Sequence, residues 1–166
     1  MTNSPAAKAS RLYFDDLEVG QRFTAASSWT VDAEQIRAFA AQFDPQPFHL
    51  EETAGRETVF GGLVASGWHT AALTMRLIVE GGGPPLAGGT VGLGAELSWH
   101  APVRPGDTLQ VRAEVVATEA SRSRPDRGRV VIRTETLNQD GQVVQTCISK
   151  VLVPRRAGAK SGREGP

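Results

Sequence analysis

The stretch SGWHTAALTMRLIV, residues 66–79, decides the fold. Apolar residues occupy nearly every side of a helix drawn over this stretch, and three glycines at 81–83 follow as a stop. A helix of this kind is stable only when other parts of the chain cover it. The sequence therefore predicts a largely buried helix, in which only Arg76 and Glu80 need a route to solvent or a partner.

Beyond this helix the apolar period changes from 3.6 to 2, which indicates strands. The expected strands cover 91–99, 109–117, 129–137 and 143–153, with turns at 104–107 and 140–141, and a weaker strand is expected around 23–29. Consecutive strands joined by tight turns pair antiparallel. The sequence therefore predicts an α+β domain, an antiparallel β-sheet wrapped around a central buried α-helix at 66–79.

A second helix is predicted to begin after Asp32. The side chain of Asp32 can cap its first turn, with Gln35 in the position of a capping box. Two prolines end it near Asp44, because proline lacks an amide hydrogen and disfavours helical geometry in the residue before it. The apolar side of this helix consists of Ile36, Phe39, Ala40 and Phe43.

The length of 166 residues suits one domain, and an apolar content of 40% is enough for a core. Eighteen Lys and Arg balance eighteen Asp and Glu, so no net basic field favours nucleic acid. Residues 11–154 are expected to form the folded unit. The small, polar residues 1–10 and the glycine-rich, basic residues 155–166 are expected to be disordered tails.

The longest mostly apolar run, 71–79, is too short to span a bilayer, so no membrane partner is expected. The chain opens with no charged-then-apolar leader, so we expect a cytoplasmic protein. A single cysteine, Cys147, excludes an internal disulfide and a thiolate zinc cluster. His69 and His100 lack metal-ligand spacing to other ligating residues, and no metal site is expected.

The segment FDPQPFH, residues 43–49, joins a carboxylate at Asp44 to an imidazole at His49 across two prolines. Fully extended, the five intervening steps span roughly 16–18 Å, too far for both side chains to share a water. A turn that begins at Asp44, with Pro45 as its second residue, would bring them together. The pair could then divide a proton transfer. The alternative is that Asp44 only begins the turn and His49 is a packing residue.

The loop FGGLVASGW, residues 60–68, places glycines directly before the central helix. Such glycines allow backbone amides to point into a cavity, and the helix N-terminus adds partial positive charge. That arrangement can polarise a thioester or similar carbonyl, so the candidate substrate-binding residues are Gly61, Gly62, Ser66 and Gly67. The simpler alternative is that Ser66 caps the helix and the glycines shape the loop, and both can hold at once.

The segments FDPQPFH, SGWHTAALTMRL and WHAPVRPGDTL resemble those of the MaoC-like dehydratases, which include (R)-specific enoyl-CoA hydratases and have a hotdog fold. The resemblance covers about residues 13–153. It implies that Asp44 and His49 are the catalytic pair that positions and activates water. Three positions depart from the family pattern: Phe43 stands where many members have Gly, Gln46 where Asn is common, and Ser66 where many have His.

The resemblance implies a hydro-lyase that adds water to a trans-2-enoyl thioester, or removes it from a (3R)-hydroxyacyl thioester. Its partner would be an acyl-CoA or acyl-carrier-protein thioester, which is substrate rather than cofactor, so no cofactor is expected. It also implies a homodimer or higher homo-oligomer with the substrate cleft near the subunit boundary.

Two other functions fit a hotdog domain. A thioesterase usually depends on a carboxylate on or beside the central helix, and residues 66–79 contain none. A non-catalytic acyl-binding subunit would be expected to lack Asp44 or His49, and both are present. The sequence therefore favours the hydro-lyase.

Overall fold

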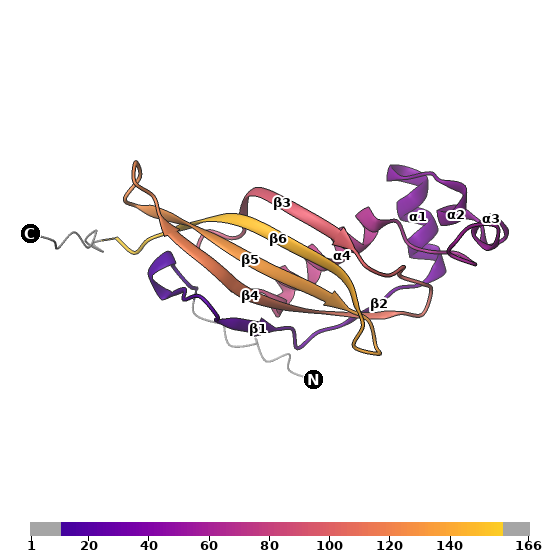
Figure 1. Cartoon of the computed structure of the whole chain (residues 1–166), viewed down its shortest axis with the longest axis horizontal. Helices are drawn as coiled ribbons and strands as arrows, with labels where there is room; N and C mark the ends of the chain where they lie inside the picture. The colour runs from indigo at the N-terminus through magenta and orange to yellow at the C-terminus, as the bar shows by residue number, and fades with distance from the viewer. Residues whose placement is uncertain (1–10, 158–166) are drawn as a thin grey trace, which may run out of the picture.

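The computed structural model describes residues 11–157. Its elements in chain order are η1 (Phe14–Asp16), β1 (Arg22–Thr24), β2 (Trp29–Thr30), α1 (Ala33–Phe43), α2 (Pro47–Leu50), α3 (Glu52–Arg56), α4 (Gly67–Leu77), the π-helical turn η2 (Ile78–Gly82), β3 (Val91–Trp99), β4 (Thr108–Ala120), β5 (Arg127–Leu137) and β6 (Val143–Pro154). Figure 1 shows the long strands as one curved sheet, with α4 behind it and α1, α2 and α3 gathered at one end. No helix within the described residues is long and apolar enough to cross a membrane.

The strands form an antiparallel sheet in the order β1-β4-β5-β6-β3. Strand β2 pairs with the first residues of β4, on the same side of β4 as β1.

The β5–β6 hairpin confirms the predicted turn at 140–141. The turn at 104–107 does not form a hairpin, since β3 pairs with β6 and β4 pairs with β5. The predicted pairing of the first two strands is therefore wrong, because the connection carries the chain from one edge of the sheet to its other side. The predicted α+β arrangement, a sheet around one central helix, is confirmed. Helix α1 is confirmed as well, since the Asp32 carboxylate accepts the N–H of Gln35 at 2.8 Å.

Helix α4 is buried on the side that faces the sheet. Leu73 and Leu77 pack there against Val111 and Val144 in the main core. The opposite side is open, with Val79 71% exposed and apolar neighbours such as Trp68 and Met75 also exposed. The prediction of burial on nearly every side therefore holds for one side only, because the sheet covers a single face of the helix.

The weak strand predicted over 23–29 is divided into β1 and β2, which both pair with β4. Five positions separate Thr24 from Trp29, whereas only three separate their partners, Arg112 and Leu109. The surplus residues must loop out of the ladder, and the strand is interrupted.

Strand β6 ends at Pro154, the predicted boundary of the folded unit, but the two residues after it still contact the domain. Arg155 donates through Nε to Asp15 at 2.8 Å, and Arg156 pairs with Asp16 at 2.8 Å. These two residues, assigned from the sequence to a disordered tail, instead hold η1 against the sheet. The rest of the predicted tails, 1–10 and 158–166, lies outside the described residues.

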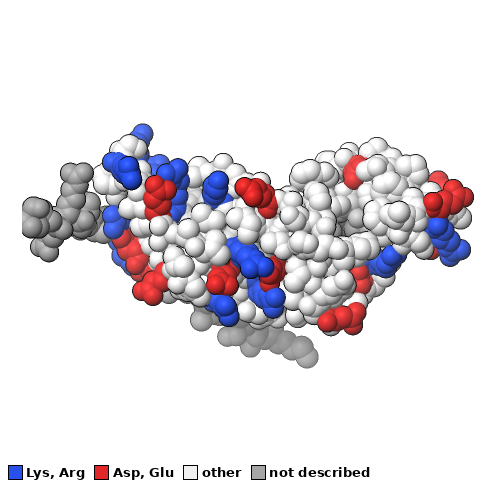
Figure 2. All heavy atoms as spheres, in the orientation of Figure 1, with Lys and Arg blue, Asp and Glu red and all other residues white. Residues whose placement is uncertain are grey.

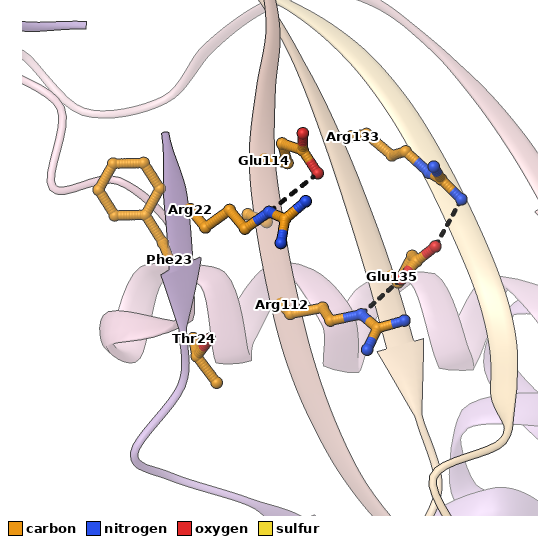
Figure 3. Close-up of a pocket in the computed structure, with 8 residues that line it drawn as sticks. Arg22, Phe23, Thr24, Arg112, Glu114, Arg133 and Glu135 are labelled. Carbon is orange, nitrogen blue, oxygen red and sulfur yellow. Dashed lines mark hydrogen bonds and ion pairs between the residues drawn. The ribbon is translucent and has the colours of Figure 1, made fainter. Parts of the chain in front are cut away.

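The outer face of the sheet is charged. Arg112 and Arg133 both bind the Glu135 carboxylate, and Arg22 pairs with Glu114 at 3.4 Å. Figure 3 shows these side chains projecting from β1, β4 and β5. In Figure 2 side chains of both signs cover the sheet, whereas the surface between the sheet and the α1–α3 end is mostly uncharged. This alternation of charged and buried positions keeps the outer face in solvent and turns the apolar face toward α4.

Replacing Leu77 by alanine tests the packing of α4 on the sheet. Leu77 is completely buried, so Leu77→Ala should lower the free energy of unfolding by about 2–5 kcal/mol. The fully exposed Val59 supplies a control, and Val59→Ala should change it by less than about 0.5 kcal/mol. Denaturant unfolding measures both, and equal small effects would contradict the assignment of α4 to the core.

Candidate active site

The chain between α1 and α2 folds more tightly than the turn predicted at Asp44. The Gln46 N–H donates to the Asp44 carbonyl at 2.8 Å, which closes a three-residue turn centred on Pro45. Pro47 then begins α2, where a proline at the first position is favoured, and His49 follows within that single helical turn. The backbone reversal brings the two predicted catalytic side chains together.

Asp44 and His49 are in direct contact, with His49 Nε2 3.3 Å from Asp44 Oδ2. The other ring nitrogen, Nδ1, lies 2.8 Å from the carbonyl oxygen of Val64. A carbonyl oxygen only accepts hydrogen bonds, so Nδ1 carries the hydrogen. A neutral imidazole would then present a lone pair on Nε2 to a carboxylate, and two acceptors would face each other. One proton held between Nε2 and Oδ2 removes this conflict.

The carboxylate of Asp44 accepts two further hydrogen bonds. Ser66 Oγ donates to Oδ2 at 2.6 Å, and Gln46 Nε2 donates to Oδ1 at 2.8 Å. The hydrogen bond from Ser66 is the main cause that holds the pKa of Asp44 below its ordinary value, and Gln46 and the charge on His49 act in the same direction against partial burial. The carboxyl group of Asp44 is therefore favoured in its ionised form.

Ser66 is completely buried and links this carboxylate to the start of α4. Its Oγ donates to Asp44 and accepts the N–H of Trp68 at 3.2 Å, which is the predicted N-cap. The sequence also predicts that Ser66 binds substrate. Its hydroxyl instead contacts Asp44, behind the surface that a substrate could reach.

A pocket of about 440 Å³ opens beside the pair. Its lining is mostly apolar and aromatic, with a few polar groups, the composition usual for a ligand site. It is formed by Asp44, Gln46, Phe48, His49, Phe60, Val64, Ala65, Gly67, Trp68, Thr70, Trp99, His100, Ala101, Pro102 and Val103. Of the three glycines predicted to bind substrate, Gly67 is the one in this lining. It is the first residue of α4, where an N–H has no acceptor within the helix.

Gly61 and Gly62 shape the preceding loop instead. The Gly61 N–H donates to the Thr58 carbonyl at 3.2 Å, and its positive φ of 67° suits glycine. Gly62 packs against Gly55, where an added Cβ would lie 2.2 Å from the Gly62 oxygen. The positive φ accounts for glycine at 61, and the 2.2 Å contact requires glycine at 55 rather than at 62. Of the three candidates, Gly67 is the one beside the Asp44–His49 pair.

The sequence analysis did not identify the two tryptophans in the pocket wall. Trp68 is the second residue of α4 and Trp99 is the last residue of β3, and their rings meet edge to face at 5.5 Å. Helical or strand periodicity treats both as ordinary apolar positions. Two features of the sequence could have indicated the pocket wall: Trp68 follows Gly67 directly, and Trp99 is the last residue of the strand predicted over 91–99.

The remaining histidines have other surroundings. His69 stacks on Phe39 with ring centres 4.7 Å apart, and burial lowers the pKa of its imidazole. His100 lines the pocket and its Nε2 lies 2.9 Å from Thr146 Oγ1. In the range 11–157 no group of three or more His, Cys, Asp or Glu side chains could hold a metal ion.

Comparison with known proteins places the chain in a family. The family model described as "MaoC like domain" matches residues 16–137, and the chain belongs to this MaoC-like family. The structure of a MaoC-like dehydratase from Rhodospirillum rubrum is 56% identical, with a TM-score of 0.84, over 87% of this chain and 98% of that one. The fold is accordingly the α+β hotdog expected from the sequence.

Two characterised relatives are more distant. A 3-hydroxybutyryl-CoA dehydratase from Methylorubrum extorquens is 36% identical over 68% of this chain and 69% of its own length. An (R)-specific enoyl-CoA hydratase from Aeromonas caviae is 32% identical over 83% of this chain and 96% of its own length. Both names describe adding water to, or removing it from, a CoA thioester.

Replacing Ser66 by alanine tests the electrostatics of the site. Without the Ser66 hydroxyl the pKa of Asp44 should rise toward its ordinary value, as a carbon-13 NMR titration of that carboxyl would measure. Since folding lowers this pKa, the stability gained from ionised Asp44 is present above the unfolded-state pKa and lost as pH falls through the folded one. Ser66→Ala should bring the folded-state pKa of Asp44 closer to its unfolded-state pKa. The pH range over which stability is lost on acidification should therefore be narrower than in the wild-type chain.

Ser149→Ala is the control, because Ser149 donates to Ile132 and not to Asp44. It should leave the titration of Asp44 unchanged. Loss of the N-cap alone would lower stability without moving the pKa, so an unmoved titration in Ser66→Ala would contradict the assignment.

Proposed function

We propose that this chain is a hydro-lyase that adds water to the double bond of a trans-2-enoyl thioester to give the (3R)-hydroxyacyl product, and catalyses the reverse dehydration. The observation that carries the proposal is the Asp44–His49 contact, in which His49 Nε2 faces the Asp44 carboxylate beside an apolar pocket. The dehydratase and hydratase relatives support the same class of reaction.

In the hydration step the Asp44 carboxylate takes a proton from the attacking water, and the water oxygen bonds to C3. The electrons of the double bond move toward the thioester carbonyl, and C2 receives the proton held on His49 Nε2. The pair then consists of a neutral carboxyl and a neutral imidazole. Proton transfer across the 3.3 Å contact restores the starting state, so protons balance over one turnover.

The thioester carbonyl gains negative charge during this step. We assign its hydrogen-bond donor to the Gly67 N–H, which lies in the pocket wall at the positive end of α4. An acyl-CoA or an acyl-carrier-protein thioester would present the same reacting group.

Removing either member of the pair should abolish most turnover. Asp44→Asn and His49→Ala should each lower kcat on the order of 10²-fold or more, because each removes one proton-transfer group. The double variant should lose little more, since both groups act on one proton and one water. Loss of crotonyl-CoA absorbance measures the rate.

Asp140→Asn is the control, because it makes the same change from carboxylate to amide at an exposed turn. It should keep normal turnover. Near-normal turnover in folded Asp44→Asn would reject the hydratase mechanism and favour the acyl-binding subunit. Loss of the thioester bond instead of hydration would favour a thioesterase.

We propose that the chain forms a homodimer through β3 and the open side of α4. β3 is an edge strand with unpaired backbone groups, and Leu93 on it is 53% exposed. Exposed apolar side chains supply a second apolar surface: Trp68 and Met75 of α4 and Val79 of the following turn η2. A second copy offers a matching edge and a matching helix face.

Placing a charge on this surface should separate the copies. Leu93→Asp should shift the molecular mass in light scattering from dimer to monomer at micromolar concentration, because a buried unpaired carboxylate is unfavourable. Val59→Asp, at a fully exposed position in the loop after α3, should stay dimeric. A wild-type monomer would contradict the proposal.

A further inference from the structure

A buried glutamine connects the sheet to the wall of the active-site pocket. Gln145 is 1% exposed and lies on β6, directly across from Trp99 on β3 and Thr136 on β5. Its Nε2 donates to Thr74 Oγ1 of α4 at 3.0 Å, and its Oε1 accepts the indole N–H of Trp99 at 2.9 Å. A buried amide is costly unless it is hydrogen-bonded, and here both ends of the amide have partners.

The Trp99 indole N–H is shared with the backbone of Gly67. Nε1 lies 3.0 Å from the Gly67 carbonyl oxygen, in addition to its contact with Gln145. The indole also covers the Gly67 Cα, since an added Cβ there would lie 2.6 Å from Trp99 Cε2. Trp99 therefore binds Gly67 by a hydrogen bond and by close packing.

Thr74 fixes the other end of the glutamine. Its hydroxyl lies 2.6 Å from Thr136 Oγ1 and donates to the Thr70 carbonyl at 2.8 Å. Thr70, Thr74 and Thr136 are all buried. With its nitrogen held in this way, the oxygen of Gln145 has a defined direction, and so has the indole that donates to it.

We propose that Gln145 and Trp99 hold Gly67 in the pocket wall so that its N–H meets the thioester carbonyl. Trp99 contacts Gly67 and the pocket directly, and Gln145 acts through Trp99. The peptide that carries this N–H is bonded to the helix through the Ser66 carbonyl, which accepts the Thr70 N–H at 3.0 Å. Trp99 restrains the other side of the residue, at the Gly67 Cα and carbonyl. The proposal rests on the proposed function, because it gives Gly67 the carbonyl as its partner.

Without the glutamine oxygen, the indole N–H retains only the Gly67 carbonyl, on the exposed side of the ring. The ring can then leave Gly67, and the residue that carries the amide loses its restraint on that side. A displacement of about 1 Å in such a group can lower a rate by as much as 10²-fold. The effect should fall on kcat more than on KM, because the carbonyl takes on charge chiefly in the transition state.

The experiment reads carbonyl polarisation without turnover. In an Asp44→Asn background, bound trans,trans-2,4-hexadienoyl-CoA should show a red-shifted absorbance, because a donor at its carbonyl stabilises the polarised chromophore. Adding Trp99→Phe, which keeps a ring but removes the N–H, should abolish most of that shift. Gln145→Met, similar in size without a hydrogen-bonding amide, should do the same.

Ser149→Ala is the matched control, because it removes a partly buried hydroxyl of the same strand, β6, whose acceptor is the Ile132 carbonyl and which makes no contact in the Gln145–Trp99 network. It should keep the full red shift. In the otherwise wild-type chain, Trp99→Phe and Gln145→Met should lower kcat on the order of 10- to 10²-fold, with a much smaller change in KM. Should Gln145→Met fail to fold, Trp99→Phe alone decides.

A full red shift in both variants would overturn the proposal, as would a bound chromophore without any red shift in Asp44→Asn alone. The proposed function fails separately, if the wild-type chain hydrates no enoyl thioester. A third outcome is a red shift that depends on Trp99 and Gln145 although the wild-type chain has no hydratase turnover. That result would support the positioning role of the two residues and reject the proposed reaction.

Discussion

The imidazole of His49 donates its Nδ1 hydrogen to the carbonyl of Val64, and the chemistry of the site depends on that contact. The acceptor belongs to the buried segment that leads into α4, and the next residue, Ala65, donates its N–H to Val103 at 2.8 Å. The ring is thus fixed to backbone that is itself held by the loop after β3. Its Nε2 is left facing Asp44, with room in that contact for one proton.

The start of α4 combines the remaining requirements. Ser66 caps the helix and binds the carboxylate, and Gly67 presents the first free amide of the helix. Packing of Leu73 and Leu77 on the sheet fixes this helix relative to Trp99, which covers Gly67. The same core that stabilises the fold therefore sets the distance between the Asp44–His49 pair and the Gly67 amide.

Much of this arrangement could be predicted from the sequence. The change in apolar period at residue 91 predicts the sheet, and the Asp32 cap and two prolines predict α1 and its end. The spacing of Asp44 and His49 suggests a joint site, but the three-residue turn at Pro45 depends on tertiary packing. The choice of Gly67 over Gly61 and Gly62 could not be made, because loop glycines look alike until their contacts are known.

Other features depend on contacts across the sheet. Gln145 lies within the strand predicted over 143–153, and nothing in its local sequence indicates that its amide binds Trp99. The open side of α4 was missed because apolar periodicity shows which residues avoid water, not what covers them. Arg155 and Arg156 have a composition typical of a tail, and their ion pairs with Asp15 and Asp16 join the two ends of the domain.

Nitrogen-15 NMR of His49, assigned by comparison with His49→Ala, tests the central claim directly. The structure predicts a hydrogen-coupled Nδ1 signal, because the Val64 carbonyl accepts from it, and a second proton in the contact between Nε2 and Asp44. In Asp44→Asn the Nδ1 hydrogen should remain, since its acceptor is unchanged. An Nδ1 without hydrogen, or a pair without a shared proton, would contradict the account.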